Sequence, residues 1–209
     1  MSTITQNAQS QSSITPGKAI ELLKEGNKRF LAAKALNRDW HQQVKETATG
    51  QYPFAAIVSC IDSRIPTEVV FDQGIGDVFN ARVAGNIVNE DILGSLEFAC
   101  KLAGAKSIVV LGHTSCGAVK GACDNAQLGN LTQMLDKIKP AVDLTPTADG
   151  EERNSGNIGF VNKVADKNVE LTIENIKSQS TVLNQMLEAG EINIVGAMYD
   201  VKTGEITFS

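Results

Sequence analysis

Two short segments, CIDSR at 60–64 and HTSC at 113–116, carry the residues of this 209-residue chain that are best suited to chemistry. The first follows the apolar run at 54–59, and the second follows the apolar run at 107–112. Continuous apolar runs of this length are typical of strands buried on both faces of a parallel sheet. Because the carboxyl ends of parallel strands meet at one edge of a sheet, we expect the two segments to lie close together.

Cys60, His113 and Cys116 form a candidate set of metal ligands within these segments. His113 and Cys116 are three positions apart, a spacing that lets both side chains reach one ion across a strand-to-helix turn. Two thiolates and one imidazole suit Zn²⁺, and three protein ligands leave a fourth tetrahedral position open. An open position is typical of a catalytic zinc site, where a bound water molecule has a pKa of about 7. The sequence therefore predicts one zinc ion per chain.

Asp62 and Arg64 lie beside the first of these ligands and are the second candidate feature. In an extended or turning backbone they can point to the same side as Cys60, so that Arg64 holds the carboxylate in a bidentate pair. Asp62 would then accept a hydrogen bond from a zinc-bound hydroxide, or move onto zinc and close the site. The alternative interpretation is a purely structural salt bridge, since such pairs also occur near clefts.

The rest of the chain predicts the elements that hold these residues. Strands and helices alternate, which predicts an α/β domain with a largely parallel central β-sheet flanked by helices. The expected strands are 54–59, 77–85, 107–112 and 192–200, with helices that include 92–104 and 156–189 and a closing hairpin at the carboxyl terminus.

The amino-terminal part of the chain is expected to differ from the rest. Residues 1–13 are rich in Ser, Gln and Thr and predict a disordered tail, which leaves 14–209 as a single domain. Thr15 and Pro16 are a good N-cap and first-turn pair, and apolar residues follow them at helical spacing. We expect this helix to be an arm outside the sheet unit that packs on a partner subunit.

Composition excludes several classes of partner. The net charge is −5 with both signs scattered, which argues against nucleic acid and against an anionic membrane surface. The polar start of the chain does not resemble a secretory signal, so we expect a cytoplasmic protein. Four cysteines are too few for a disulfide scaffold. A lone cysteine is more often part of a core than a ligand, and this is our interpretation of Cys100 and Cys123.

At this set of residues the chain resembles the β-class carbonic anhydrases. The resemblance runs from about Thr15 to the carboxyl terminus and includes CIDSR, FNARVAGN, GHTSCG and VGAMYD, in the family's order. It implies reversible hydration of CO₂ to bicarbonate by a zinc-bound hydroxide. Cys60, His113 and Cys116 would be the zinc ligands and Asp62 with Arg64 the supporting pair. The family also implies a homodimer or homotetramer.

The resemblance further implies an apolar substrate pocket, part of which comes from a neighbouring subunit. The matching positions are Gln51, Phe79, Ala84, Phe98 and Gly117. Gln51 would donate a hydrogen bond to the substrate, and Phe79 and Phe98 would form apolar walls. Ala84 stands where valine is usual and Phe98 where tyrosine is usual, and both replacements keep the wall apolar.

Some bacterial members of the family close the site with the aspartate on zinc and bind bicarbonate at a regulatory site. An aromatic residue three positions before the first ligand belongs to that regulatory site, and here the position is Ile57. Tyr199 matches another residue of the same site. Without the aromatic partner, we expect an open zinc site at neutral to alkaline pH, with Asp62 as a metal ligand only in a closed state.

Two alternative functions remain open from the sequence. The same site can attack a CO₂ mimic such as carbonyl sulfide or carbon disulfide, and release of sulfide would identify that activity. A zinc-stabilised scaffold with no catalysis is the second alternative. The presence of both Asp62 and Arg64 argues against the scaffold, because a structural zinc ion needs no such pair.

Overall fold

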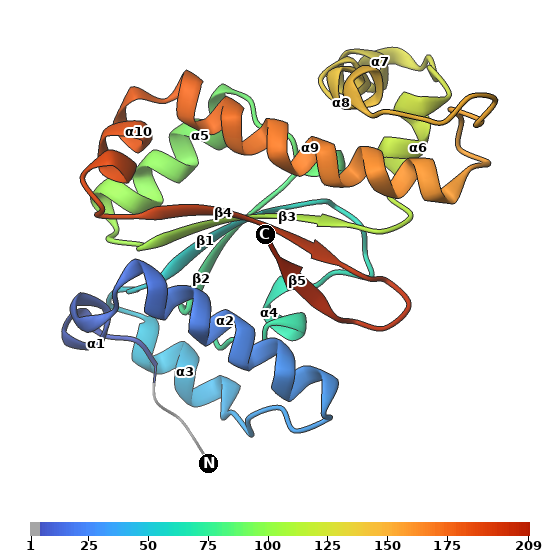
Figure 1. The fold of residues 1–209 in the computed structure, drawn as a ribbon. Coiled ribbons are helices and arrows are strands. Elements are labelled where there is room, and N and C mark those ends of the chain that lie inside the picture. Colours follow the sequence, from blue (N-terminus) through green and yellow to red (C-terminus); the bar gives the residue numbers. More distant parts are fainter. Residues whose placement is uncertain (1–4) are drawn as a thin grey trace.

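A five-stranded sheet forms the centre of the computed structural model, which describes residues 5–209 (Figure 1). The strand order is β2-β1-β3-β4-β5. The first four strands are parallel, and β5 pairs with β4 in the antiparallel sense. The strands are β1 Ala55–Ser59, β2 Val78–Arg82, β3 Ser107–His113, β4 Asn193–Tyr199 and β5 Ile206–Phe208. The predicted α/β fold, with a mostly parallel sheet and a closing hairpin, is confirmed.

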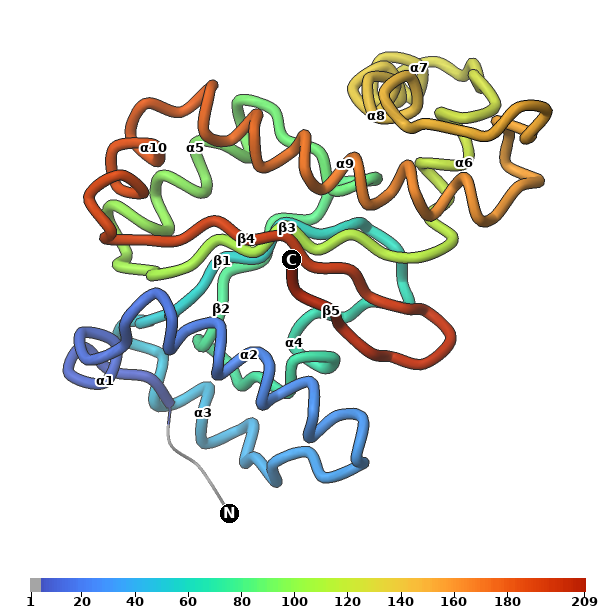
Figure 2. The backbone as a smooth tube through the Cα atoms, in the orientation of Figure 1, coloured from blue at the N-terminus to red at the C-terminus, as the bar shows by residue number. Residues whose placement is uncertain are grey.

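Helices cover both faces of this sheet (Figures 1 and 2). One face carries α1 Ala8–Ser13, α2 Pro16–Leu31, α3 Trp40–Thr47 and α4 Thr67–Val70. The other carries α5 Glu90–Glu97, α9 Ile158–Gln179 and α10 Thr181–Glu188. Helices α6 Gly117–Cys123, α7 Gly129–Asp136 and α8 Lys139–Leu144 gather around the amino-terminal part of α9. A 3₁₀ turn at Ala84–Asn86 follows β2, and a π-helical turn at Phe98–Leu102 follows α5.

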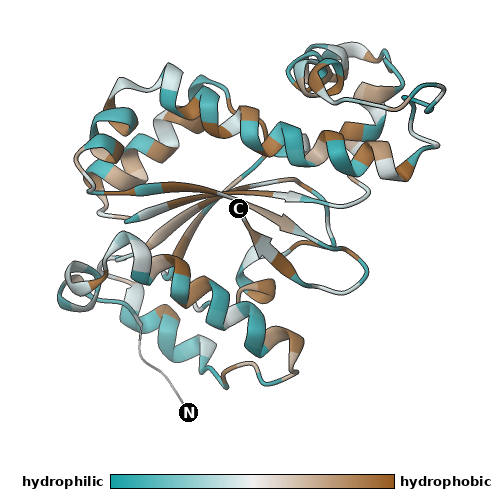
Figure 3. Ribbon diagram, viewed as in Figure 1, coloured by the Kyte–Doolittle hydropathy of each residue, from teal (hydrophilic) through white to brown (hydrophobic). Residues whose placement is uncertain are grey.

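The central strands are buried on both sides, which explains their continuous apolar sequence. Successive side chains of a strand point to opposite faces of the sheet. Ala56 and Val58 of β1 accordingly pack in the core under α5, α9 and α10, whereas Ala55 and Ile57 pack in the core under α2 and α4. Helices α2 and α9 carry both hydrophobic and hydrophilic residues, as expected of helices with one face on a sheet (Figure 3).

Helix α2 begins where the sequence predicts, because the side chain of Thr15 accepts a hydrogen bond from the backbone N–H of Lys18. Its apolar face is buried in its own chain, with Leu23 fully buried in the core that contains Ile57. A Cβ atom on Gly26 would lie 1.7 Å from the carbonyl oxygen of Phe71, so only glycine permits this approach. The helix therefore belongs to the sheet unit, a correction to the expectation of an arm outside it. Its packing on a partner subunit stays a prediction.

Asp72 ties the loop after α2 to the segment after α4. It is 4% exposed and accepts hydrogen bonds from the side chains of Arg29 and Arg38. Burial alone would raise the pKa of Asp72, but the hydrogen bonds from the two arginines outweigh it and hold the pKa below its usual value. The ion pairs of Asp72 with Arg29 and Arg38 thus stabilise the fold as long as Asp72 is ionised.

Two segments differ from the sequence-based expectation. Ala8–Ser13, inside the expected disordered tail, form α1, which Asn7 caps and Gln11 anchors by donating to the carbonyl oxygens of Pro53 and Ala103. Residues 1–4 of that expected tail lie outside the described residues. The helix expected at 156–189 is two helices, α9 and α10, on either side of an extended residue. Within residues 5–209, no helix combines the length and hydrophobicity needed to cross a bilayer.

Candidate metal centre

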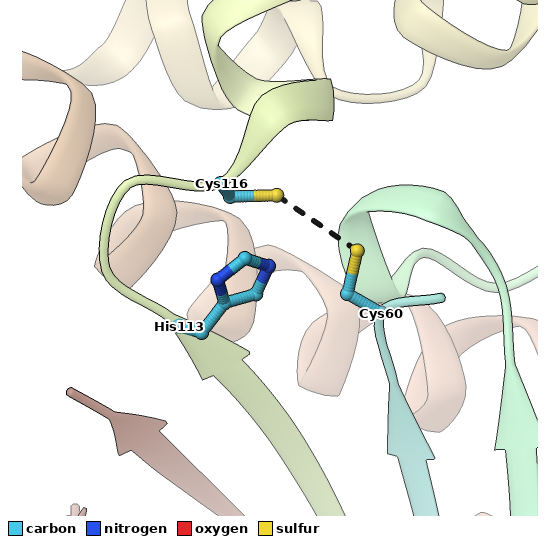
Figure 4. Close-up of side chains that lie close together, drawn as sticks. All are labelled: Cys60, His113 and Cys116. Carbon is cyan, nitrogen blue, oxygen red and sulfur yellow. Dashed lines mark hydrogen bonds between the residues drawn. The ribbon is translucent and has the colours of Figure 1, made fainter. Parts of the chain in front are cut away.

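Cys60, His113 and Cys116 converge beyond the carboxyl ends of two neighbouring strands. Cys60 directly follows β1, His113 is the last residue of β3, and Cys116 is the N-cap of α6. Because β1 and β3 are paired in parallel, their carboxyl ends lie side by side. The ligand atoms all lie within 4.8 Å of one another, and the two sulfur atoms are 4.0 Å apart. Figure 4 shows the three side chains pointing toward one another. The predicted ligand set is thus assembled by the fold.

The imidazole of His113 is oriented for a metal ion. Its Nδ1 lies 3.0 Å from the carbonyl oxygen of Thr114, which can only accept, so Nδ1 carries the proton and Nε2 has a free lone pair. His113 is fully buried, and no described residue offers Nε2 a hydrogen bond. A buried polar atom without a partner is unfavourable, and a cation at this position removes the penalty. A histidine that binds a metal ion through one ring nitrogen usually makes a hydrogen bond with the other, as Nδ1 does here.

The two thiols are suited to the same ion. The Cys116 thiol, as a hydrogen-bond donor to Cys60, lowers the pKa of Cys60, and the N–H of Gly85 acts in the same direction. Donation to Cys60 and burial both raise the pKa of Cys116. Of the two thiols, Cys60 is therefore the more acidic. Two buried thiols beside an unpaired imidazole nitrogen match the ligands that zinc prefers.

Asp62 and Arg64 form the predicted bidentate pair. Nε and Nη2 of Arg64 donate to the two carboxylate oxygens at 2.9 and 2.7 Å, and the backbone N–H of Arg64 donates to the first oxygen at 3.0 Å. These bonds lower the pKa of Asp62 to about 2 against the opposing effect of burial, so the carboxylate is ionised at neutral pH. Its Oδ2 lies 3.9 Å from Nε2 of His113. A carboxylate held by Arg64 thus stands at the edge of the metal centre.

Arg82 is a further residue of this site, and the sequence analysis missed it. It is the last residue of β2 and is paired in register with Ser59. Its Nε donates to the carbonyl oxygen of Cys60 at 2.9 Å, and its Nη2 donates to the carbonyl oxygen of Asp62 at 2.6 Å. Arg82 therefore holds the backbone that carries the first ligand and the carboxylate. The sequence feature that could have identified Arg82 is its place in the FNARVAGN segment, at the end of the strand beside β1.

An apolar cavity of about 270 Å³ opens onto the metal centre. Cys60 and Asp62 line it, and most of the remaining wall consists of apolar or small residues: Ile61, Ala84, Gly117, Ala118, Gly121, Leu131, Met134 and Leu135. Ala84 and Gly117 are two of the predicted pocket residues. A Cβ atom on Gly117 would have no neighbour within 4 Å, so that side of the cavity is open.

The other three predicted pocket residues lie elsewhere in the chain. Phe79 and Phe98 pack edge to face, with ring centroids 6.1 Å apart, and line a separate cavity of about 470 Å³ beside the edge strand β2. Phe98 is 51% exposed, and Gln51 is also exposed. One chain by itself therefore brings Ala84 and Gly117 to the metal centre but leaves Gln51, Phe79 and Phe98 away from it.

The residues given a structural or regulatory interpretation lie outside this cavity. Cys100 is buried in the core under α5 and α10, and Cys123 is half-buried against the core around α6. Ile57 and Tyr199 pack together in the core on the α2 side of the sheet. Ile57 is fully buried, and burial, as the largest cause, raises the pKa of Tyr199.

Comparison of the sequence with known proteins leads to the same family. The family model for carbonic anhydrase matches residues 55–206. Carbonic anhydrase 2 of Mycobacterium tuberculosis is 34% identical over 197 residues, which cover 90% of both chains. A carbonic anhydrase of Mycolicibacterium smegmatis is also 34% identical, over 91% of this chain and 92% of its own.

Solved structures show the same fold. A β-carbonic anhydrase of Aspergillus fumigatus superposes with a TM-score of 0.71 at 28% identity, over 81% of each chain. A tetrameric β-carbonic anhydrase of Sordaria macrospora gives 0.68 at 26% identity, over 88% of this chain and 93% of its own. The metal centre, the family match and these relatives lead to one conclusion: the chain belongs to the β-class carbonic anhydrase family and is a zinc-binding enzyme of the carbonic anhydrase type.

Proposed function

We propose that the chain hydrates CO₂ reversibly at the Cys60–His113–Cys116 centre, with Asp62 as the group that orients the attacking water. The observation that carries this proposal is the unpartnered Nε2 of His113 beside two buried thiols, with an ionised carboxylate 3.9 Å away. Cys60, His113 and Cys116 would hold the zinc ion, which would supply an acidified water; in carbonic anhydrases with three histidine ligands the pKa of that water is about 7.

Asp62 serves as a hydrogen-bond acceptor in this proposal. Because its pKa is about 2, it stays ionised at every pH at which the enzyme would work. An ionised carboxylate only accepts hydrogen bonds, so it turns the proton of the attacking water toward itself and a lone pair toward the substrate. Arg64 keeps the carboxylate at the edge of the centre by occupying both of its oxygens.

The same pairing supports an open metal site. Both oxygens of Asp62 are bound by the Arg64 side chain, so a movement of the carboxylate onto the metal would disturb this bidentate pair. Ile57, in place of an aromatic residue, removes one part of the family's regulatory site. We therefore propose that the site stays open at neutral to alkaline pH. A crystal structure at a pH above about 8, beyond the expected pKa near 7, with Asp62 directly on zinc would contradict this.

The apolar cavity suits a substrate that has no dipole. CO₂ gains little from polar groups before it reacts, and a wall such as that formed by Ala84 and Gly117 leaves few ordered water molecules to displace. Asp62 is the charged group of that wall. Among the described residues that line this cavity, none has a side-chain amide or hydroxyl that could donate to the substrate oxygen, and Gln51 is our candidate for that donor.

We propose that a second subunit brings Gln51, Phe79 and Phe98 to the centre, as homodimer or homotetramer. The high exposure of Phe98, the cavity beside it and the unpaired outer edge of β2 support a contact at this face. The Sordaria macrospora enzymes are tetrameric. Light scattering gives the assembly, and an active monomer would contradict a shared pocket.

Complementation tests the shared pocket directly. Cys60→Ser removes a ligand, and Gln51→Ala removes the proposed donor from the neighbouring pocket. If each site uses one residue from each subunit, a mixture of the inactive Cys60→Ser variant and the impaired Gln51→Ala variant forms hybrids with one native site, and activity returns. If both residues act within one subunit, the mixture stays as weak as its components.

The test of the activity itself is stopped-flow CO₂ hydration of zinc-loaded protein from about pH 6.5 to about pH 9, around the expected pKa near 7. Cys60→Ser should abolish a rate that rises with pH. Cys123→Ser, a control on a half-buried cysteine outside the centre, should not. A protein that binds one zinc ion per chain yet lacks this activity would favour carbonyl sulfide or carbon disulfide as substrate, or a scaffold.

The compartment is also a proposal. All four cysteines are free in the structure, including Cys60 and Cys116, whose sulfur atoms are only 4.0 Å apart. A thiol pair intended for metal must remain reduced, which is the normal state in the cytosol. We therefore propose a cytoplasmic location.

A further inference from the structure

The three metal ligands lie at or just beyond the ends of regular elements, so the loop and turn between those ends must be held in place. Cys60 lies in the loop after β1 and contacts the 3₁₀ turn at Ala84–Asn86. His113 and Cys116 lie on either side of a two-residue turn after β3. Ligand sites keep their geometry only when surrounding groups orient the ligands. Helix α9 contacts both regions, and Figure 2 shows it lying across the sheet and reaching α6 at its amino-terminal end.

The first contact is made by Asn162 with the turn between His113 and Cys116. Ser115, inside that turn, has a φ of +57°, in the left-handed region that residues other than glycine rarely adopt. Its backbone N–H donates to Oδ1 of Asn162 at 2.9 Å. Because a backbone N–H can only donate, the orientation of the Asn162 amide is determined. This hydrogen bond holds Ser115 in the strained conformation that brings His113 and Cys116 together.

The second contact is made by Asn168 with the backbone beside Cys60. Asn168 is 2% exposed, and its Nδ2 donates to the carbonyl oxygen of Gly85 at 2.7 Å. Gly85 in turn donates its N–H to Sγ of Cys60, with a donor-acceptor distance of 3.4 Å. Gly85 has a φ of +76°, and a Cβ atom there would lie 2.4 Å from Cδ1 of Ile138. Asn168 therefore holds the carbonyl group of the residue whose own N–H donates to the first thiolate, and the two groups belong to adjacent peptide units joined at the Cα of Gly85.

From these contacts we propose that α9 is the positioning element of the metal centre and that Asn162 and Asn168 are its positioning residues, one for each ligand loop. The two residues are six positions apart, roughly 9 Å along the helix axis. Between and beside them, Phe160, Val161 and Val164 are fully buried, so the helix is a rigid reference for both loops. In the described part of the chain neither asparagine forms a side-chain hydrogen bond to a metal ligand, and each acts through one backbone group.

The alternative is that these asparagines only satisfy buried backbone groups. That role would lower the stability of the protein when they are replaced but would leave the properties of a bound metal unchanged. The directions of the hydrogen bonds separate the two interpretations. Asn162 accepts, so Asn162→Asp keeps the bond and Asn162→Leu removes it. Asn168 donates, so Asn168→Leu removes its bond while approximately keeping its volume.

The experiment measures the affinity for zinc by competition with a chelator, together with the visible spectrum of the cobalt-loaded protein. Asn162→Leu and Asn168→Leu should each lose about 10- to 100-fold in zinc affinity. Asn168→Leu should also shift the thiolate-to-cobalt charge-transfer band, because it loosens the N–H donor to Cys60. Asn162→Asp should stay within about threefold of the native protein. Thr172→Val is the matched control, since Thr172 is a buried polar residue of the same helix and should leave both readouts unchanged.

Loss of stability with unchanged zinc affinity and spectrum would overturn the proposal, as would an Asn162→Asp variant that binds zinc as weakly as Asn162→Leu. Asn162 is only half-buried, so if Asn168→Leu does not fold, the Asn162 pair decides the outcome. The inference depends on the zinc site but not on the reaction. Because metal affinity and the cobalt spectrum are measured without CO₂, a failure of the proposed catalytic roles would leave this test intact.

Discussion

Replacement of Arg64 by alanine removes the partner that keeps Asp62 off the metal. The pKa of Asp62 is lowered from 3.8 to about 2, chiefly by the side-chain hydrogen bonds of Arg64. That difference corresponds to roughly 2.5 kcal/mol at about 1.36 kcal/mol per pKa unit. Half of the Arg64 side chain is exposed, so solvent screening reduces the contribution of the pair to about 1 kcal/mol. A change of this size shifts an equilibrium by roughly fivefold.

Without Arg64 the carboxylate of Asp62 would be free to move toward a bound metal ion, because its Oδ2 is only 3.9 Å from Nε2 of His113. We expect Arg64→Ala to lower the rate of CO₂ hydration at neutral pH by up to about fivefold, since a fivefold shift of the equilibrium can reduce the open fraction by no more than that. Arg64→Lys keeps the charge but not the bidentate geometry, and its rate should lie between those of the native protein and the alanine variant.

Stopped-flow kinetics and the spectrum of the cobalt-loaded protein check this together. A carboxylate ligand in place of water changes the visible bands of the cobalt ion, so the alanine variant should differ from the native protein in spectrum as well as in rate. If Arg64→Ala kept both the native rate and the native spectrum at neutral pH, then the pairing would not control the position of Asp62.

Three further predictions concern stability and the metal. Asp72→Asn should lower the free energy of unfolding at neutral pH by about 3 kcal/mol because it leaves two arginines without their buried carboxylate. Since the folded pKa of Asp72 is depressed, its stabilisation is present above the unfolded pKa of about 3.9 and is lost as the pH falls through the folded pKa. In urea titrations the free energies of unfolding of the variant and the native protein should therefore converge once the pH falls below the folded pKa. Gly26→Ala should lower the free energy of unfolding by about 3 kcal/mol in the same assay, because its Cβ would overlap the carbonyl oxygen of Phe71. The control Gly17→Ala places its Cβ in open space on the same helix and should be neutral or stabilising. Equal effects of the two substitutions would contradict the packing argument. Removal of zinc with a chelator should abolish CO₂ hydration but leave the circular dichroism spectrum unchanged. The reason is that the sheet is buried in two hydrophobic cores that do not include the metal ligands. Unfolding on chelation would show that the ion also supports the fold.

Local patterns predicted most of the sheet because its signals are short-range. The continuous apolar run before Cys60 forms β1, and the run before His113 forms β3, as expected of strands covered on both faces. The start of α2 followed from Thr15 and Pro16, since capping depends on neighbours only three residues away. These elements depend on burial and backbone chemistry that adjacent residues determine.

Elements that depend on distant contacts were missed or misjudged. The helix expected at 156–189 is interrupted at Ser180, which caps α10 through the N–H of Leu183 and donates to the side chain of Glu97. That partner lies 83 positions away along the chain. Helix α1 is similarly anchored through Gln11, by a carbonyl of residue 53 and another of residue 103. The residues at 8–13 have no strong helical pattern, so nothing in the local sequence indicated an ordered helix there. The groups that anchor this helix belong to the rest of the folded domain.

The sequence by itself determined which residues can bind metal, because ligand chemistry belongs to side-chain type and the three-residue spacing of His113 and Cys116 is local. Only the tertiary structure decided that Cys60, 56 positions away from Cys116, comes within 4.0 Å of its sulfur atom. It also decided that Arg82 holds the first ligand loop and that Gln51 and Phe98 stay apart from the centre. The physical reason is that such distances depend on strand order and helix packing, which are properties of the whole core and not of any one segment.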